Sequence, residues 1–363
     1  MARRPGSLEG VAIMNELLEF YRGKRVLITG HTSFKGAWLC KMLNLAGAKV
    51  TGYSLNRPTD PNLFELSGVA DLVTAVGGDV RDLAALRAAF QLAQPEFAFH
   101  LAAQPIVRLS YQEPHQTFET NVMGTVNFLE CLRTVPGVKS AVNITTDKVY
   151  ENLEWEWPYR ENDRLMGLDP YSNSKSCSEL VTYSYRKSFF ADGKVAVSTG
   201  RSGNVIGGGD FGRDRIIPDC VRAAERGQPI IVRNPHSIRP YQHVLEPLSA
   251  YLTIARAQYL DHALAGSYNV GPADEDCVTT GALVDMFCNA WGEGLTWINQ
   301  HDGGPHEASF LKLDCSRIRQ TLGWRSRWHV GDAVSATVEW TKAYLAGEDV
   351  GQVMEQQIRH YFA

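Results

Sequence analysis

The sequence predicts an α/β fold in which a doubly wound parallel sheet is followed by a smaller mixed α/β lobe. Short β-branched runs alternate with amphipathic helical stretches from residue 25 to residue 200. A glycine-rich turn follows the first of these runs, and the alternation ends after Arg201, where glycines and prolines become frequent. A regular strand–helix alternation of this kind gives a parallel sheet that helices cover on both faces.

Local patterns justify the elements of the first half in order. Arg25–Thr29 is a short β-branched run bounded by glycines, which is typical of a buried strand. The helix expected at 35–46 has apolar residues at helical spacing, and Asp82 has the position of an N-cap for the next helix. The other strands expected in this half are 49–53, 71–76 and 96–102.

The same reasoning divides the rest of the chain. We expect helices at 11–21, 117–132, 174–190, 279–290 and 331–346, and strands at 138–145 and 195–200. The predicted domains are an N-terminal extension at 1–22, a dinucleotide-binding domain at 23–200 with a return segment around 240–272, and a substrate lobe formed mainly by 201–363.

Composition excludes several classes of protein. The 363 residues include 36 Lys+Arg and 40 Asp+Glu, a formal net charge of −4, which argues against a protein that binds nucleic acid by neutralising many phosphates. Since no run of about 18 apolar residues occurs, no membrane-spanning helix is expected. The seven cysteines form no C-x-x-C pair, so we expect reduced thiols, no metal site and a cytoplasmic protein.

The turn Gly30–Gly36 lies between the first strand and the first helix and favours binding of a dinucleotide. Glycines let the backbone approach a pyrophosphate, and the helix N-terminus supplies free N–H groups. A plain tight turn is the alternative, but the strand–turn–helix context makes this a Rossmann-type site, with Thr32 and Phe34 also in the turn. Ser33 replaces the usual middle glycine, so we expect it at negative φ, where its hydroxyl would donate to the pyrophosphate.

The adenosine end of the predicted site carries a weaker signal. Asn56 and Arg57 stand where an acidic residue usually binds the ribose, so NAD is expected while NADP is not excluded. Arg57 would contact a 2′-phosphate, stack on adenine or remain a solvated loop residue. Asp79 and Val80 follow the third strand, in a position that suits the adenine amino group, and a helix-preceding cap is nearly as plausible for Asp79.

Two groups of residues indicate acid/base chemistry. Tyr171 and Lys175 are four residues apart at the start of a long helix and share one face. An ammonium near a phenol favours the phenolate, which can act as a base. Thr146, Asp147 and Lys148 follow the fifth strand, and this excess of proton-transfer groups suggests more than simple hydride transfer. A surface pair and a solvated loop are the alternative readings.

Several motifs together resemble a known family. The glycine turn, His100–Ala103, Asn121–Thr125, the Tyr171/Lys175 pair and Arg201–Gly207 are similar to those of the extended short-chain dehydrogenases/reductases, the NAD-dependent epimerases and dehydratases of nucleotide sugars. The resemblance runs from about residue 20 to about residue 345, over nearly the whole chain.

The segment 146–148 is the most discriminating of these motifs. Within the family, epimerases have no such acid/base pair, dTDP-glucose dehydratases carry Thr-Asp-Glu, and a lysine in third place resembles the dehydratases of CDP-D-glucose. The resemblance therefore implies an NAD-dependent hydro-lyase that converts CDP-D-glucose to CDP-4-keto-6-deoxy-D-glucose, a step of deoxysugar biosynthesis. Alternatives are another nucleotide-sugar dehydratase or a 4-epimerase, and, further off, a non-catalytic NAD-binding protein.

The resemblance also implies roles for individual residues. Tyr171, with Lys175 and Thr146, would oxidise C4, whereas Lys148 and Asp147 would remove the C5 proton and protonate the departing 6-hydroxyl. Further cofactor contacts are expected at Ala102, Ala103, Gln104 and Asn121. Substrate contacts are expected at Arg108, Ser110, Asn204, Arg215, Arg239 and His306. The helices that contain Asn121 and Tyr171 would pair two subunits into a homodimer.

Overall fold

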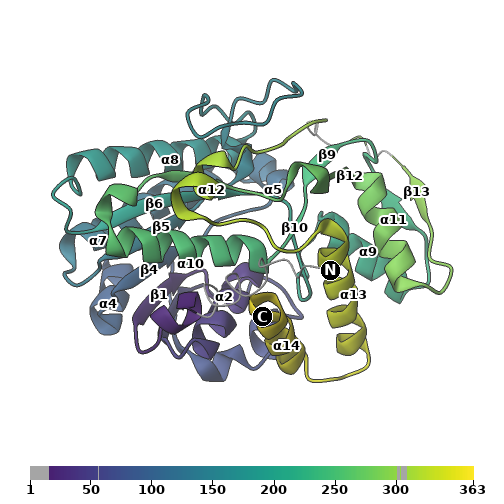
Figure 1. The fold of residues 1–363 in the computed structure, drawn as a ribbon, viewed down its shortest axis with the longest axis horizontal. Coiled ribbons are helices and arrows are strands. Elements are labelled where there is room, and N and C mark those ends of the chain that lie inside the picture. The colour runs from purple at the N-terminus through teal and green to yellow at the C-terminus, as the bar shows by residue number, and fades with distance from the viewer. Residues whose placement is uncertain (1–15, 56, 301–302, 304–308) are drawn as a thin grey trace, which may run out of the picture.

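The computed structural model describes residues 16–55, 57–300, 303 and 309–363. Within them, a seven-stranded sheet has the order β11-β6-β5-β4-β1-β2-β3, and every neighbouring pair is parallel (Figure 1). Its strands are β1 (Arg25–Thr29), β2 (Lys49–Ser54), β3 (Thr74–Gly77), β4 (Phe97–His100), β5 (Ser140–Ile144), β6 (Ala196–Ser202) and β11 (Ser267–Val270). This sheet confirms the expected fold class.

Alternating side chains along the strands give the sheet an apolar core on each face. Val26 and Ile28 of β1 pack with α2 (Phe34–Leu45) and α10 (Leu245–Leu260). Leu27 packs on the opposite face with α4 (Leu83–Ala93) and α7 (Gly124–Thr134), beside α8 (Pro170–Ser188). The sheet is therefore covered on both faces, as α10 in front of β5 and β6 shows in Figure 1.

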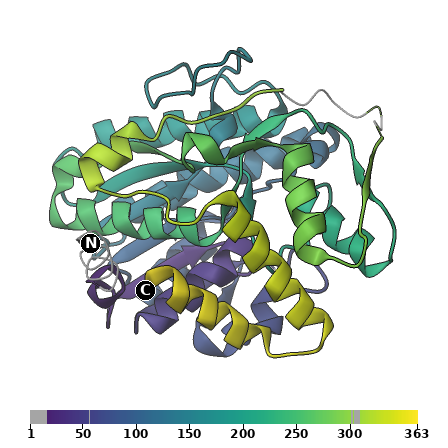
Figure 2. The ribbon, with the colours of Figure 1, turned by 45° about the vertical axis from the view of Figure 1, so that its right-hand side comes forward.

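A third apolar cluster forms the core of the smaller lobe, which lies beside the sheet in Figure 2. Its elements are β7 (Val205–Ile206), α9 (Ile216–Glu225), β8 (Ile230–Val232), β9 (Ile238–Pro240), β10 (Gln242–His243), β12 (Cys277–Thr279), α11 (Thr280–Trp291), β13 (Trp297–Asn299) and α13 (Val330–Leu345). Helix α14 (Val350–Phe362) returns to pack against α2.

Short helices complete the chain: α3 (Leu63–Leu66), η1 (Val69–Leu72), α5 (Val107–Gln112), α6 (Pro114–Phe118), η2 (Glu119–Met123), η3 (Asp147–Val149), η4 (His262–Leu264), η5 (Asp274–Asp276) and α12 (Ser316–Leu322). The η2 turn is π-helical and joins α6 to α7 without a break. None of the helices in the described part of the chain is long and apolar enough to cross a membrane. All seven cysteines are free thiols.

Two expected elements differ from the structure. The strand expected at 71–76 is divided between the 3₁₀ turn Val69–Leu72 and the shorter strand β3. The helix expected at 174–190 begins four residues earlier because Asp169 caps it, through a hydrogen bond from the Ser172 N–H, and Pro170 occupies its first turn. The domain limits and the part of the 11–21 helix before residue 16 stay predictions, the latter lying outside the described residues.

The strand order identifies the edge of the sheet at which a ligand is expected to bind. The chain moves from β1 to β2 and β3 in one direction, and from β4 to β5 and β6 in the other. The carboxyl ends of β1 and β4 therefore flank the point where the connections reverse, which is where open α/β sheets bind their ligands.

Candidate active site

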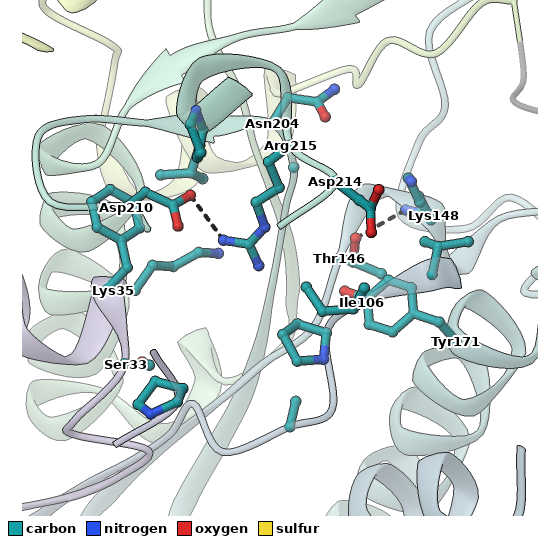
Figure 3. Close-up of a pocket in the computed structure, with 18 of the residues that line it drawn as sticks. Ser33, Lys35, Ile106, Thr146, Lys148, Tyr171, Asn204, Asp210, Asp214 and Arg215 are labelled. Atoms are coloured by element: carbon teal, nitrogen blue, oxygen red, sulfur yellow. Dashed lines mark hydrogen bonds and ion pairs between the residues drawn. The ribbon is translucent and has the colours of Figure 1, made fainter. Parts of the chain in front are cut away.

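A cavity of about 710 Å³ opens at this reversal point. The glycine turn, the segment after β5 and the start of α8 line one part of it, and residues of the smaller lobe line the rest (Figure 3). Large clefts with convergent polar groups are the usual binding sites of enzymes. Most of the predicted site residues converge here, although they come from separate parts of the sequence.

The glycine turn has the close packing that a dinucleotide site needs. Gly30 has φ +78°, and a Cβ on it would lie 2.7 Å from the Ala102 nitrogen. A Cβ on Gly36 would lie 2.2 Å from the Gly30 carbonyl oxygen. No side chain fits at either position, so the backbone and the N-terminus of α2 remain open to a phosphate. Thr32, Ser33, Phe34, Ala102 and Ala103 also line the cavity.

Ser33 is the N-cap of α2. Its φ is −74°, its Oγ accepts the Gly36 N–H, and its hydroxyl donates to the Gly30 carbonyl oxygen at 2.7 Å. The negative φ is the one that the sequence predicts for a serine here. Because the hydroxyl has one proton and the turn already uses it, donation to a pyrophosphate requires that this hydrogen bond be broken first.

The adenosine end is shaped by ion pairs. Arg57 lines the cavity and pairs with Glu65 at 2.5 Å. Asp79 and Val80 line it as well, but the Asp79 carboxylate accepts hydrogen bonds from the Arg81 backbone and guanidinium, which hold its pKa below the usual range. Asn56 lies outside the described residues.

Gln104 and Asn121 do not line the cavity. The Asn121 side chain accepts the Gln104 N–H at 2.8 Å and donates to the Gln104 carbonyl oxygen and to Ser174 Oγ. The Gln104 side chain binds the Ile106 backbone and Thr117 Oγ1. Both amides are buried and occupied, so they position the loop after β4 and the start of α8 instead of presenting groups to a cofactor.

Lys175 is buried one helical turn after Tyr171, and its Nζ donates to the Ile144 carbonyl oxygen at 3.2 Å. Burial and the nearby Lys35 charge lower its pKa to about 8. The Lys175–Ile144 hydrogen bond thus joins α8 to the end of β5, and the side chains of Tyr171 and Lys175 both line the cavity.

The sequence predicts that a nearby ammonium favours the Tyr171 phenolate. In the chain without ligand, burial raises the pKa of Tyr171 to about 12, and the Asp147 charge acts in the same direction, against the smaller opposing effects of a Thr146 hydrogen bond and the Arg215 charge. Desolvation of the phenolate outweighs these contacts in the protein without ligand.

Asp147 is 1% exposed, and its Oδ1 accepts the Thr146 hydroxyl at 2.9 Å. Its Oδ2 has no hydrogen-bond partner among the described residues. A Cβ on Gly203 would lie 1.9 Å from this atom, so only glycine leaves room for the carboxylate. Lys148 lines the same cavity and is half-buried. A buried, unsatisfied carboxylate oxygen in a cleft is the mark of a group that awaits a substrate.

The smaller lobe contributes cationic and amide groups. Asn204 adopts φ +48°, and its buried Nδ2 has no partner among the described residues. Arg215 pairs with Asp210 at 2.9 Å and points into the cavity in Figure 3. Arg239, on β9, is buried at the cavity wall. These three residues fit the diphosphate binding that the sequence predicts.

Of the other predicted substrate contacts, Arg108 lines the cavity and lies 3.9 Å from Asp214. Ser110 does not line it, because its buried hydroxyl donates to the Val107 carbonyl oxygen at 2.6 Å. His306 lies outside the described residues.

Sequence reasoning missed five charged residues that line the cavity: Lys35, Asp210, Asp214, Asp219 and Arg233. Burial and the Arg215 charge lower the pKa of Lys35 to about 8. Asp214 also pairs with Arg233 at 3.4 Å. The sequence signals were the lysine inside the glycine turn and the charged residues that follow Gly209, including the adjacent Asp214 and Arg215. Residue order alone does not show which way these side chains point.

Known proteins resemble the chain over nearly its full length. The family model for GDP-mannose 4,6 dehydratase matches residues 27–337. A CDP-glucose 4,6-dehydratase of Salmonella typhimurium is 47% identical over 350 residues, covering 95% of this chain and 98% of that protein. A probable dTDP-glucose 4,6-dehydratase of Sinorhizobium fredii is 27% identical and covers 87% of this chain and 92% of its own length.

Solved structures share the fold. A dTDP-glucose 4,6-dehydratase of Streptomyces venezuelae, solved with NAD and TYD bound, has a TM-score of 0.75 at 23% identity and covers 90% of this chain and 99% of its own. A UDP-glucose 4-epimerase of Thermotoga maritima, solved with UDP-glucose, has a TM-score of 0.76 at 21% identity, over 88% and 99%. The resemblance found in the motifs is thereby confirmed, and the chain belongs to the extended short-chain dehydrogenase/reductase family of nucleotide-sugar epimerases and dehydratases.

Proposed function

We propose that this protein is an NAD-dependent CDP-D-glucose 4,6-dehydratase, which converts CDP-D-glucose to CDP-4-keto-6-deoxy-D-glucose with loss of water. The observation that carries the proposal is the meeting of two acid/base pairs in one cavity, Tyr171 with Lys175 and Asp147 with Lys148. An epimerase needs the first pair alone. The 47% identical relative named CDP-glucose 4,6-dehydratase supports the choice of nucleotide.

The cofactor side fits NAD. Gly30 and Gly36 leave the backbone open where a Cβ would collide, and the N-terminus of α2 points to that space. When bound, NAD accepts hydride from C4 of the sugar and returns it to C6. Arg57 already pairs with Glu65, which leaves less positive charge for a 2′-phosphate and favours NAD over NADP.

Oxidation at C4 is assigned to the start of α8. Tyr171 takes the proton of the 4-hydroxyl. Thr146 donates a hydrogen bond to the same oxygen once its hydroxyl has turned away from Asp147 Oδ1. Because burial holds the pKa of Tyr171 at about 12, this step depends on cationic groups that favour the phenolate, and Arg215 acts in that direction. Lys175 lies one helical turn away and orients the site through the Ile144 carbonyl.

Elimination is assigned to the segment after β5. The 4-ketone acidifies the C5 hydrogen, and neutral Lys148 removes it as a proton. The electron pair of that C–H bond forms the C5–C6 double bond, and the 6-hydroxyl leaves with the proton that Asp147 supplies, as water. After C6 is reduced, C5 regains a proton from Lys148. Tyr171 then releases the proton that it took from the 4-hydroxyl, and Asp147 regains one from solvent, so that the protons balance over the turnover.

Cationic and amide groups of the smaller lobe hold the substrate diphosphate. Arg239 and Arg215 supply charge, and Asn204 supplies an unused amide donor. Arg108 lines the same cavity from α5. A site that combines two arginines with a buried amide is suited to a pyrophosphate.

A product assay tests the proposal. The purified protein is incubated with NAD and, separately, with CDP-, dTDP-, UDP- and GDP-D-glucose, and the 4-keto sugar is measured by its absorbance in alkali. We expect the 4-keto-6-deoxy product with CDP-D-glucose and much slower turnover with the other three. A 4-epimer without loss of water, or faster turnover of another nucleotide, contradicts the assignment.

We also propose a homodimer that forms through α7 and α8 and works in the cytoplasm. Large apolar side chains on α8, namely Leu180 and Tyr183, are more than half exposed in the single chain. An exposed apolar helix face of this kind is typical of a subunit interface. Light scattering should give twice the mass of the chain, and Leu180→Glu should return it to the monomer.

A further inference from the structure

A buried ion pair lies behind the two acid/base pairs. Glu179, on α8, accepts Arg201 Nη2 at 2.8 Å, and the two side chains are 1% and 3% exposed. Burial raises the pKa of Glu179, but the Arg201 charge and hydrogen bonds outweigh burial and hold it below the usual range. Buried pairs contribute little net stability, because desolvation of both charges offsets their attraction. Net stability therefore does not account for this pair, and its contacts indicate which parts of the site it positions.

The pair binds both ends of the segment that carries Asp147 and Lys148. At the first end, the Thr145 hydroxyl donates to Glu179 Oε1 at 2.5 Å. At the second end, Arg201 Nη1 donates to the Tyr150 hydroxyl at 2.8 Å, and the guanidinium lies 5.2 Å from the centre of that ring. Residues 145–150 are thus held at their two ends by one ion pair.

The same pair belongs to the helix that carries the oxidation residues. Tyr171, Lys175 and Glu179 occupy successive turns of α8. Arg201 comes from β6, and the Glu179 carboxylate also accepts the Thr199 hydroxyl of that strand at 2.8 Å. The Ser176 hydroxyl of α8 also donates to the Val149 carbonyl oxygen at 2.7 Å. A shift of the ion pair would therefore move the rest of 145–150 about that hydrogen bond, whereas Tyr171 and Lys175 would keep their places on the helix.

We infer that Glu179 and Arg201 are positioning residues for the elimination step: they fix Asp147 and Lys148 relative to Tyr171 and Lys175 on α8. This inference rests on the proposed function and goes beyond it, since neither residue lines the cavity. Loosening either end of 145–150 should slow elimination more than oxidation. Both acid/base groups of the elimination lie in this segment, whereas oxidation takes from it only the hydrogen bond of Thr146, and its base, Tyr171, is on α8.

Two isosteric variants each remove one contact with the ion pair, Thr145→Val at the Glu179 end and Tyr150→Phe at the Arg201 end. Tyr150→Phe also removes the hydrogen bond that the Tyr150 hydroxyl donates to Asn269 Oδ1 at 2.6 Å. The matched control is Thr182→Val. It also removes a buried hydroxyl between α8 and β5, where the Thr182 hydroxyl oxygen accepts a hydrogen bond from the Asn143 amide at 2.9 Å. It leaves both anchors of 145–150 in place. Thr145→Ser keeps the hydroxyl and serves as the rescue. Single-turnover experiments with CDP-D-glucose follow reduced cofactor by absorbance and the 4-keto-6-deoxy sugar after quenching.

We expect Thr145→Val and Tyr150→Phe to form reduced cofactor at a rate within about twofold of wild type, while product forms about 10- to 100-fold more slowly, so that reduced cofactor accumulates. Thr182→Val should lower Tm similarly without separating the two rates, and Thr145→Ser should restore product formation. Equal slowing of both steps, or a lowered Tm with unchanged rates, overturns the positioning role. A wild-type protein that makes neither species overturns the proposed function instead.

Discussion

The two walls of the cavity are built in different ways. The cofactor wall is centred on one continuous segment, Gly30–Gly36, in which Gly30 and Gly36 leave no room for a Cβ and the backbone stays open to a ligand. The sugar wall is assembled from charged and amide side chains of distant segments, among them Arg108, Asn204, Arg215 and Arg239. A backbone site depends on glycine spacing, while a side-chain site depends on how the chain folds.

This difference explains which parts were predictable. The glycine turn is local, so its strand, its turn and α2 follow from the residue order. Asn121, Gln104 and Ser110 were expected to contact ligands, but each has its side chain bound to nearby protein groups, and only the fold reveals those partners. Lys35 was missed for the same reason, because the sequence shows a lysine in the turn but not that it faces Arg215.

The limits of the helices and strands were likewise predictable only where a local signal marks them. The early start of α8 was signalled by Asp169 and Pro170, a capping residue and a first-turn proline, which place the first helical residue at 170 instead of 174. The strand expected at 71–76 was shortened because Leu72 belongs to a partly exposed 3₁₀ turn. Periodicity alone does not distinguish a short apolar turn from the start of a strand.

The largest effect is expected at Lys148. Lys148→Met removes the proposed base, so the rate of dehydration should fall by about 100- to 10,000-fold, while C4 oxidation continues and reduced cofactor accumulates. Rapid-quench analysis with absorbance detection measures both. Lys187→Met, on the exposed end of α8, is the control and should behave as wild type. Dehydration at the wild-type rate in Lys148→Met would show that another group is the base.

Gly203 tests whether the sugar wall also depends on a backbone position. In Gly203→Ala the new Cβ would collide with the Asp147 carboxylate, so we expect dehydration to fall about 100-fold with little change in NAD affinity. Gly331→Ala, at a site with open space around it, provides the matched control. Turnover of Gly203→Ala equal to that of the control would mean that Asp147 need not stay where the structure has it.

Arg215 belongs to the sugar wall, and its charge also acts on the proposed oxidation base Tyr171. Arg215→Ala should raise KM for CDP-D-glucose by about tenfold, because a charge-assisted contact to the diphosphate is lost. Its charge lowers the pKa of Tyr171, so its removal raises that pKa further. The alkaline pH at which the oxidation rate levels off should therefore move upward, which a pH profile of single-turnover oxidation measures. An unchanged profile together with an unchanged KM would exclude Arg215 from both roles.

The smallest effect is expected at Ser33. Its hydroxyl proton is donated to the Gly30 carbonyl, so Ser33→Gly should leave NAD affinity within about threefold of wild type, and glycine is a tolerable N-cap. Isothermal titration calorimetry measures the affinity. A larger loss would mean that the hydroxyl rotates to donate to the pyrophosphate, and the cofactor wall would then depend on a side chain after all.

The central claim is that oxidation, elimination and reduction occur on one sugar in one cavity. CDP-D-glucose that carries deuterium at C4 tests it most directly, with the position of the label in the product read by NMR. We predict that the deuterium moves to the C6 methyl group of the same molecule, with solvent hydrogen at C5. Deuterium that remains at C4 of a sugar that keeps its 6-hydroxyl, or that is lost from a dehydrated product, would contradict the account.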